Sequence, residues 1–327
     1  MTPDTPALTG FSAFSGIGGF EQGFRMAGVP IEWIGHSEID PYPESIYRTH
    51  FTFPNYGDLT KLTAQDIPDF DILVGGFPCQ AFSVAGRRKG FQDQRGSLFF
   101  ELARLLRNKK PRYFLLENVK GLLFHNEGRT FSAIIRTLTE LGYCVEWSVC
   151  NSADFGVPQH RERVFLIGYI GKIPTRKVFP LIREGTADSQ EQLPATKTAE
   201  PGQGMRYANH RRRPEICSRS VAPVLTPDQE QIRQSQRFKK SGSPAYTLVA
   251  SKQHGVYDGY HIRKLTPREC ERLQGFQDDW TRYGSTPDGN PVPISDYRRY
   301  HCLGNAVTTT VVAAIAKKLF SHFSQSS

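Results

Sequence analysis

A cysteine at the end of an apolar stretch is the residue best suited to nucleophilic chemistry. Cys79 lies in Gly75-Gly76-Phe77-Pro78-Cys79-Gln80, directly after the apolar run 71–77. Such a run predicts a buried strand, and open α/β sheets bind ligands at the carboxyl ends of their strands. A thiolate there is a strong nucleophile. A lone cysteine is usually an inert part of the core, but segment 81–97, which follows, is rich in Gly, Ser, Arg and Lys and is unlike a core segment.

Charged side chains mark the ends of two further predicted strands. Glu117 closes the apolar run 113–116, where a low-dielectric environment raises the pKa of a carboxyl and lets it donate a proton. Arg161 and Arg163 lie two residues apart at the start of strand-like residues 163–170, so both point to the same side. Two guanidiniums in that position suit an anionic or carbonyl oxygen. Each of these residues, taken singly, is equally compatible with an ordinary solvated charge.

A Gly-rich turn, residues 15–19, joins the first apolar run to a helix-like segment. Its glycines Gly16, Gly18 and Gly19 allow a ligand to approach the backbone, and the helix N-terminus offers free N–H groups. Glu38 ends the second predicted strand, where an acid of a nucleotide-binding fold can accept hydrogen bonds from both ribose hydroxyls. The turn is not a complete Gly-x-Gly-x-x-Gly fingerprint. Taken alone, it is as consistent with a tight turn that binds nothing.

Strand-like and helix-like stretches alternate as far as residue 170. Short apolar runs indicate strands, and apolar side chains at helical spacing, such as Leu98, Leu102 and Leu105, indicate helices. This order predicts an α/β fold with a Rossmann-like, mostly parallel sheet and helices on both faces. The expected strands are 8–14, 31–39, 71–77, 113–119, 143–149 and 163–170; the expected helices follow the Gly-rich turn to Ala27 and cover 98–106 and 131–141.

The stretch 171–264 differs from the rest of the chain in composition and charge. Gly, Pro, Ser, Gln and Arg become frequent and helical periodicity fades, which is typical of irregular structure. The stretch holds 17 Lys or Arg against 8 Asp or Glu, so it accounts for the whole net charge of +9. A local basic excess suits a polyphosphate partner, although a solvated surface gives the same count. Arg211-Arg212-Arg213 is its densest basic cluster.

Regular structure is expected again from Leu265. Thr266 is a suitable N-cap, with Pro267 at the first helical position and Glu269 at the third. The apolar stretch 307–320 predicts a C-terminal helix. We therefore expect a first domain of residues 1–175, a smaller, irregular and largely β domain of residues 176–264, and a last part of residues 265–327 that returns to the first domain.

The bulk composition indicates a soluble globular protein. Hydrophobic residues make up 38% of the chain and charged residues 22%, which is ordinary for that class. No apolar run reaches the ~20 residues that span a bilayer, and residues 1–10 do not resemble a signal peptide. None of the six cysteines forms a Cys-x-x-Cys pair, so no zinc site is expected. These features favour a cytoplasmic protein that does not associate with membranes.

Taken in chain order, these features resemble the bacterial DNA cytosine C5-methyltransferase family, and the resemblance runs nearly from end to end. Each block is only moderately specific, but seven or eight blocks in the right order and spacing leave little room for chance. The matching blocks are residues 14–20, 38, 58–59, 75–80, 117–119, 159–163, 263–276 and 304–307.

The resemblance implies methyl transfer from S-adenosylmethionine to carbon 5 of a cytosine in double-stranded DNA. That carbon is a poor nucleophile, so family members first add a cysteine thiolate to carbon 6; Cys79 corresponds to that thiolate. Glu117 corresponds to the acid at N3 and the exocyclic amine, Arg163 to the residue at the O2 edge, and Arg161 to its neighbour near the nucleophile. The base must leave the duplex to reach Cys79. No side chain is clearly suited to removing the carbon 5 proton, so a water molecule is expected to do so.

The resemblance also implies where the methyl donor binds. Phe14 is expected to face the adenine, Glu38 the ribose and Asp58 the adenine amine. The family often has a large aromatic residue after the acid; this chain has Ile39, which packs on adenine but stacks less well. No metal is expected. The expected donor-binding residues are Phe14, Gly16, Gly18, Gly19, Glu38, Ile39, Asp58, Leu59, Pro78, Leu98, Asn305 and Val307.

Segment 81–97 corresponds to the loop that closes over DNA, and residues 171–263 to the target-recognition region. In some relatives a serine two places beyond Ser83 enters the space left by the flipped base, but here that position is Ala85. Thr247-Leu248 resembles a short family motif, and Gln234 and Gln236 are weaker candidates for insertion into the duplex. A monomer is expected, with a restriction endonuclease acting on the same site as a candidate partner. The expected DNA contacts are Gln80, Ser83, Arg87, Arg88, Arg95, Gln234 and Thr247.

Three other interpretations account for some of these features. The related transfer-RNA cytosine methyltransferases share several of these blocks but carry a Cys-Phe-Thr signature, which residues 171–264 lack. A non-catalytic DNA-binding protein with a decayed active site is disfavoured because Cys79, Glu117 and Arg163 are all present. A nicotinamide or flavin oxidoreductase is compatible with the Gly-rich turn, but it leaves Pro78-Cys79-Gln80 and the basic stretch without a role.

Overall fold

The computed structural model describes residues 8–78, 98–170, 177–181, 222–225, 239–240, 242–250, 254–257 and 262–321. Cys79 and the arginine cluster Arg211-Arg212-Arg213 lie outside the described residues. The expected DNA contacts Gln80, Ser83, Arg87, Arg88, Arg95 and Gln234 also lie outside them, so what was expected of all these residues stays a prediction.

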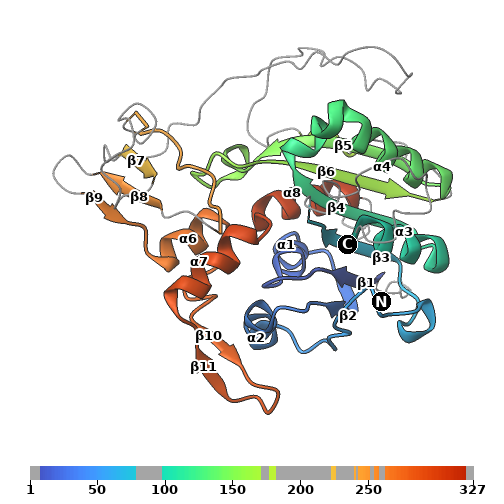
Figure 1. Ribbon diagram of the computed structural model, residues 1–327, viewed down its shortest axis with the longest axis horizontal. Helices are drawn as coiled ribbons and strands as arrows, with labels where there is room; N and C mark the ends of the chain where they lie inside the picture. The colour runs from blue at the N-terminus through green and yellow to red at the C-terminus, as the bar shows by residue number, and fades with distance from the viewer. Residues whose placement is uncertain are drawn as a thin grey trace, which may run out of the picture.

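A six-stranded sheet in the order β2-β1-β3-β4-β6-β5 forms the centre of the molecule (Figure 1). Neighbouring strands among β2, β1, β3 and β4 are parallel, whereas β6 is antiparallel to both β4 and β5. The predicted mostly parallel sheet is therefore confirmed. The strands are β1 (Leu8–Ala13), β2 (Ile31–Ser37), β3 (Ile72–Gly76), β4 (Tyr113–Val119), β5 (Cys144–Asn151) and β6 (Glu162–Tyr169).

Helices cover both faces of this sheet, because successive strand residues point to opposite sides. On β4, Leu116 belongs to the core under α3 and α4, while its neighbour Leu115 belongs to the core under α1 and α8. None of the helices among the described residues is long and apolar enough to cross a membrane. The covering helices are α1 (Gly19–Met26), α8 (Thr309–Leu319), α3 (Leu98–Lys109) and α4 (Arg129–Glu140).

A third core lies beside the Gly-rich turn and joins α2 (Pro41–His50), α6 (Pro267–Leu273) and α7 (Asp296–Asn305). Trp280 packs in this core and its indole N–H donates to the carbonyl of Ile17 at 3.0 Å. The C-terminal part of the chain thus packs against residues of the N-terminal part around the Gly-rich turn and α2.

Two small sheets complete the described parts. One of them, β7-β8-β9, is antiparallel and lies at one side of the molecule, away from the central sheet (Figure 1). The other is the hairpin β10-β11. The small elements are β7 (Ala222–Leu225), β8 (His254–Tyr257), β9 (Ile262–Lys264), β10 (Tyr283–Ser285), β11 (Pro291–Pro293) and the short helices η1 (Ala64–Asp66), η4 (Lys120–Leu123), η5 (His125–Gly128) and η6 (Ser152–Phe155).

Helix α1 carries an acid inside the protein. Glu21 is 1% exposed and lies in the first turn of α1, where its Oε1 accepts a hydrogen bond from the Tyr47 hydroxyl at 3.0 Å. Burial raises the pKa of Glu21 to about 7, because a carboxylate removed from water loses its solvation. Between pH 4.5 and about 7, the folded protein therefore holds a proton on Glu21 that the unfolded chain releases.

We predict that Glu21→Gln makes stability less dependent on pH. The folded-state pKa lies above the ordinary value, so the stability of the wild type falls as pH rises from 4.5 to about 7. Glutamine still accepts the Tyr47 hydroxyl but does not ionise. Denaturant unfolding should show equal stability at pH about 4.5 and a gain for the variant on the order of 2–3 kcal/mol at pH about 8.

Glu32→Gln is the matched control, because Glu32 is exposed on β2. It should change the pH dependence little. If Glu21→Gln and the wild type lose stability equally between the two pH values, Glu21 does not titrate as described.

Candidate functional site

A cavity of about 210 Å³ lies where the Gly-rich turn, the ends of β2, β3 and β4, and the junction of α7 and α8 meet. The fold therefore brings together residues from widely separated parts of the sequence. The expected site residues that line the cavity are Phe14, Gly16, Gly19, Glu38, Glu117, Asn305 and Val307.

The Gly-rich turn reaches the cavity in an unusual backbone conformation. Gly16 and Gly18 have positive φ angles of 56° and 83°, which glycine adopts at little cost, but Phe14 also has a φ of 54°. A Cβ on Gly19 would lie 2.6 Å from Cγ1 of Val307, so only glycine allows the turn to approach the α7–α8 junction this closely. The N-terminus of α1, with its free N–H groups, faces the same space.

Glu38 connects this turn with the start of α2. Its Oε2 accepts the N–H of Gly16 at 2.9 Å, and its Oε1 accepts the N–H groups of Ile39 at 2.9 Å and Asp40 at 2.8 Å. Burial raises the pKa of Glu38, while these hydrogen bonds oppose the rise. The carboxyl is thus held rigidly at the wall of the cavity.

Glu117 and Arg163 form a largely buried ion pair at the end of β4. Arg163 Nε lies 3.0 Å from Glu117 Oε1. Burial raises the pKa of Glu117, and the positive charges of Arg163 and then Arg161 lower it. Since the pKa remains above its usual value, the pair presents a carboxyl that can take up or share a proton next to a fixed positive charge.

Asn118 ties the end of β3 to the end of β4. Its side chain is 2% exposed, its Nδ2 donates to the carbonyl of Phe77 at 2.7 Å, and its Oδ1 accepts the N–H of Val119 at 2.8 Å. The backbone that leads to Pro78 is therefore fixed relative to Glu117. Asn118 lies in block 117–119, which resembles the family, but no role was predicted for it from the sequence.

Arg161 is buried rather than open to the cavity. It is 2% exposed; Nη1 donates to the carbonyl of Leu248 at 2.7 Å, and Nη2 to those of Ala306 at 2.8 Å and Gly304 at 3.1 Å. Burial, and next the charge of Arg163, lower the pKa of Arg161 to about 9. Its Nε makes no hydrogen bond to any described residue. Arg161 therefore joins the segment around Leu248 to the α7–α8 junction, and its Nε–H has no acceptor among the described residues.

Gln159 holds the same segment from the other side. Its Oε1 accepts the N–H of Leu248 at 2.7 Å, and its Nε2 donates to the carbonyl of Leu273 at 2.9 Å. The hydroxyl of Thr247, expected to contact DNA, is hydrogen-bonded to the carbonyl of His160. The Thr247-Leu248 motif is thus docked on the start of β6.

Several expected donor contacts lie apart from the cavity lining. The Oδ1 of Asp58 accepts the N–H and the hydroxyl of Thr60 at 3.0 and 2.7 Å. Leu59 is part of the core, whereas Ile39 is 74% exposed.

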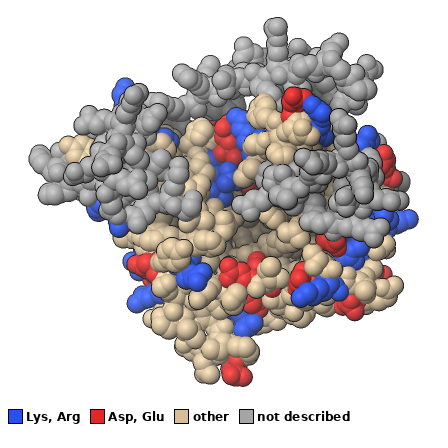
Figure 2. All heavy atoms as spheres, in the orientation of Figure 1, with Lys and Arg blue, Asp and Glu red and all other residues tan. Residues whose placement is uncertain are grey.

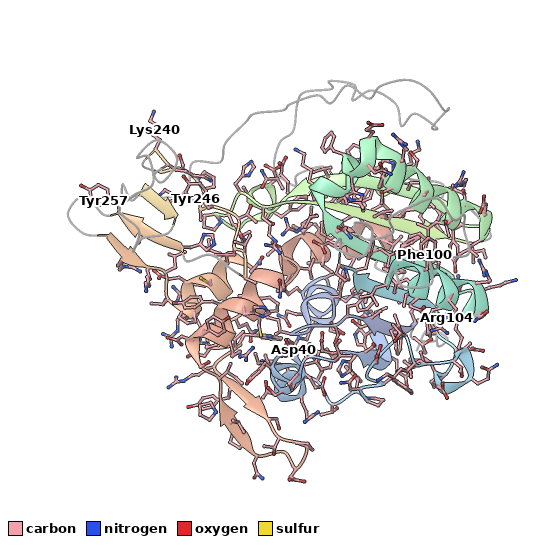
Figure 3. All side chains as sticks on the ribbon, in the orientation of Figure 1. Asp40, Phe100, Arg104, Lys240, Tyr246 and Tyr257 are labelled. Carbon is pink, nitrogen blue, oxygen red and sulfur yellow. The ribbon has the colours of Figure 1, made fainter. Side chains whose placement is uncertain are left out.

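Conversely, Ser15, Asp40 and Cys302 line the cavity, although the sequence did not predict them as site residues. Asp40 is the N-cap of α2 and lies on the side of α2 near α7 (Figure 3). Pro41, the next residue, is a common first residue of a helix and could have marked Asp40 as the N-cap in the sequence. The expected donor contacts outside the lining are Gly18, Ile39, Asp58, Leu59, Pro78 and Leu98.

The described part of the surface that faces the viewer in Figure 2 carries mixed charge. Figure 2 shows blue and red side chains interspersed over the described part of that face, with no large area of one sign. This agrees with the sequence, in which the residues outside 171–264 have equal numbers of basic and acidic side chains.

Solved structures share this fold. The methyltransferase Dnmt2 of S. pombe matches with a TM-score of 0.65 at 19% identity and covers 97% of this chain and 99% of its own. A DNA modification methyltransferase encoded within an E. coli prophage, described as putative, matches with a TM-score of 0.62 at 21% identity, with 97% and 99% covered.

The chain is also similar in sequence to bacterial methyltransferases over most of their length. The Type II methyltransferase M.DsaV of Dactylococcopsis salina is 37% identical over 94% of this chain and 85% of its own length. The Type II methyltransferase M.SsoII of Shigella sonnei is 37% identical over 98% and 84%. The family model of the C-5 cytosine-specific DNA methylases matches residues 8–321. This chain therefore belongs to the C-5 cytosine-specific DNA methylases, enzymes that use S-adenosylmethionine to methylate cytosine in DNA (EC 2.1.1.37).

Proposed function

We propose that this enzyme methylates carbon 5 of a cytosine flipped out of a specific double-stranded DNA sequence, through a covalent bond between Cys79 and carbon 6. The observation that carries the proposal is the buried Glu117–Arg163 pair, 3.0 Å apart, at one cavity with the Gly-rich turn and Glu38. A carboxyl and a guanidinium side by side match the polar edge of cytosine, which has N3 and the amine beside the O2 acceptor.

Each polar group of the base then has a partner of the right kind. The pKa of Glu117 is raised by burial, so its protonated form can donate to N3 while its second oxygen accepts from the exocyclic amine. Arg163 donates only, which suits O2. The Nε–H of Arg161, which has no hydrogen-bond partner among the described residues, is the donor we assign to the neighbourhood of the nucleophile. A base that stayed stacked in the duplex would not reach this depth.

The cavity also fits the methyl donor. Glu38 offers carboxylate oxygens to ribose hydroxyls, Phe14 an aromatic ring to adenine, and the N-terminus of α1 free N–H groups. Asn305 and Val307 close the opposite wall, and Ser15, Asp40 and Cys302 are further contacts that we add from the structure. S-adenosylmethionine, when bound, supplies a methyl group on a positively charged sulfur.

The chain's own groups then perform the remaining steps. The Cys79 thiolate adds to carbon 6 and forms a sulfur–carbon bond, while Glu117 supplies or shares a proton at N3 so that the ring does not become a full anion. Carbon 5 gains nucleophilic character and takes the methyl group as its bond to the sulfonium sulfur breaks, which leaves S-adenosylhomocysteine. The proton at N3 returns to Glu117. A water molecule removes the carbon 5 proton, and the electron pair of that C–H bond expels Cys79 as the thiolate. Asn118 fixes the backbone before Pro78 and so helps to set the position of the nucleophile.

Residues 176–264 are proposed to recognise the target sequence. Among the described residues of this region, Lys240, Tyr246 and Tyr257 extend from the part around β7, β8 and β9 (Figure 3), and Lys239 Nζ lies 4.5 Å from the centre of the Tyr246 ring. Basic and aromatic side chains together suit a nucleic acid surface. We further propose a cytoplasmic monomer, working alongside a restriction endonuclease of the same specificity.

Cys79→Ser should abolish methyl transfer without preventing binding. Serine is a much poorer nucleophile at neutral pH, so we expect transfer of labelled methyl groups to unmethylated genomic DNA to fall at least about 10³-fold. Donor and DNA affinities should stay close to those of the wild type. Cys144→Ser, which changes a half-buried thiol at the start of β5, is the control and should remain active. Substantial turnover by Cys79→Ser would rule out its role as nucleophile.

Replacing Arg211, Arg212 and Arg213 together with Ala separates affinity from sequence recognition. If the three side chains contact phosphates, DNA affinity falls for every sequence and the salt dependence flattens, by at most about 0.9 per lost contact. The methylated sequence, read by bisulfite sequencing, stays the same. Unchanged affinity and unchanged salt dependence would show that the cluster does not contact DNA.

A hybrid tests the whole region. Residues 171–264 are exchanged for those of a relative of known specificity, and the methylated sequence of the active hybrid is determined. We expect it to acquire the specificity of the inserted segment. An active hybrid that keeps the original preference would contradict the assignment.

A further inference from the structure

The Gly-rich turn depends on Ser15, which lies between two residues with left-handed backbone. Phe14 and Gly16 have φ angles of 54° and 56°, and for the phenylalanine this conformation is strained. Ser15 is 5% exposed and lines the cavity. Its N–H donates to the carbonyl of Ser37 at 3.1 Å, and its Oγ lies 2.8 Å from Nδ1 of His36. The strained turn is thus anchored to β2 through one residue.

His36 is a hydrogen-bond acceptor toward Ser15. Its side chain is 1% exposed, and burial, together with the charge of Arg48, lowers the pKa of His36 to about 4, so the ring is neutral at physiological pH. A neutral imidazole carries one N–H. Nε2 faces the carboxylate of Glu44, with Oε2 at 3.5 Å. We assign the proton to Nε2, which faces Glu44, so that the unprotonated Nδ1 accepts the Ser15 hydroxyl.

The orientation of the ring is fixed independently of Ser15. Tyr47 of α2 stacks on His36 with ring centres 3.8 Å apart and planes inclined by 21°. The hydroxyl of Tyr47 in turn donates to Glu21 of α1 at 3.0 Å. Three elements, β2, α2 and α1, therefore determine where Nδ1 points.

We propose that His36 is a positioning residue of the donor site: by accepting the hydrogen bond of Ser15, it holds the Gly-rich turn in the shape that binds S-adenosylmethionine. This inference rests on the donor site proposed above. His36 does not line the cavity, so it acts through Ser15 and makes no contact with the donor itself.

Two substitutions separate hydrogen bonding from packing. His36→Phe keeps an aromatic ring against Tyr47 but removes the acceptor. His36→Asn loses the ring, but its side-chain carbonyl can take the place of Nδ1. In the full-length enzyme, S-adenosylhomocysteine affinity measured by calorimetry should fall roughly five- to tenfold for His36→Phe and stay within about threefold of the wild type for His36→Asn. For His36→Phe, KM for the donor should rise while kcat at saturating donor changes less than about twofold.

A double-mutant cycle tests the pairing. Ser15→Ala alone should weaken S-adenosylhomocysteine binding about as much as His36→Phe, and the double variant should be little worse than either single one, because both changes remove the same bond. Fully additive losses would overturn the proposal, because the two side chains would then act separately. If His36→Phe does not fold, His36→Leu, which also lacks the acceptor, takes its place in the cycle.

Thr9→Val is the matched control for general destabilisation of β1. Thr9 lies at the opposite end of β1, and its hydroxyl donates to Asp71 at 3.0 Å, away from the cavity. This variant should lower thermal stability but leave donor affinity unchanged. A comparable loss of donor affinity in Thr9→Val would show that destabilising β1 at any position weakens donor binding. That result would overturn the role of His36.

Glu38→Ala shows whether a negative result means that His36 has no positioning role or that the donor does not bind at the proposed site. If Glu38→Ala weakens S-adenosylhomocysteine binding but His36→Phe, shown to be folded, does not, the positioning role is wrong. An equal loss in His36→Asn and His36→Phe would also overturn it. If Glu38→Ala itself leaves the affinity unchanged, the proposed donor site is wrong.

Discussion

A buried guanidinium is the constraint on which the arrangement of this molecule depends. Arg161 is 2% exposed and, with a pKa lowered only to about 9, it keeps its charge at neutral pH. A buried charge without hydrogen-bond acceptors is strongly destabilising. Arg161 obtains its acceptors from the carbonyls of Leu248, Gly304 and Ala306. The sheet, the Thr247-Leu248 motif and the α7–α8 junction must therefore meet at one point, and their meeting closes the wall of the cavity.

The site follows from how the strands pair at this edge. Because β6 is antiparallel to β4, its first residues lie beside the last residues of β4, and Arg163 is paired with Val119. This register brings Arg163 to Glu117, while parallel β3 brings Gly76 beside Glu117. A carboxyl with a raised pKa, a fixed positive charge and the backbone that leads to Pro78 thus lie close together. The cavity proposed to bind the methyl donor lies next to them because the ends of β1 and β2 belong to the same sheet edge.

The sequence predicts the sheet well because apolar runs and their ends are local properties. Helix α6 begins at its predicted cap, with Thr266 and Glu269 bonded reciprocally. Helix α2 has the same kind of signal, Asp40 followed by Pro41, but was missed because only Pro43, Ile46 and Tyr47 are buried along it and the apolar period is weak. Arg161 and Arg163 look alike in sequence; their different roles depend on carbonyls 87 to 145 residues away, which no local pattern encodes.

The central claim is that catalysis passes through a bond between Cys79 and carbon 6 of cytosine. Duplexes of random sequence that contain 5-fluorocytosine test it directly, because fluorine does not leave as a cation and the last elimination is blocked. In the presence of S-adenosylmethionine, we expect a protein–DNA complex that survives denaturation, with mass spectrometry placing the modified base on the peptide that contains Cys79. Failure to form such a complex on duplexes that the enzyme demonstrably binds, or attachment at another residue, would contradict the account.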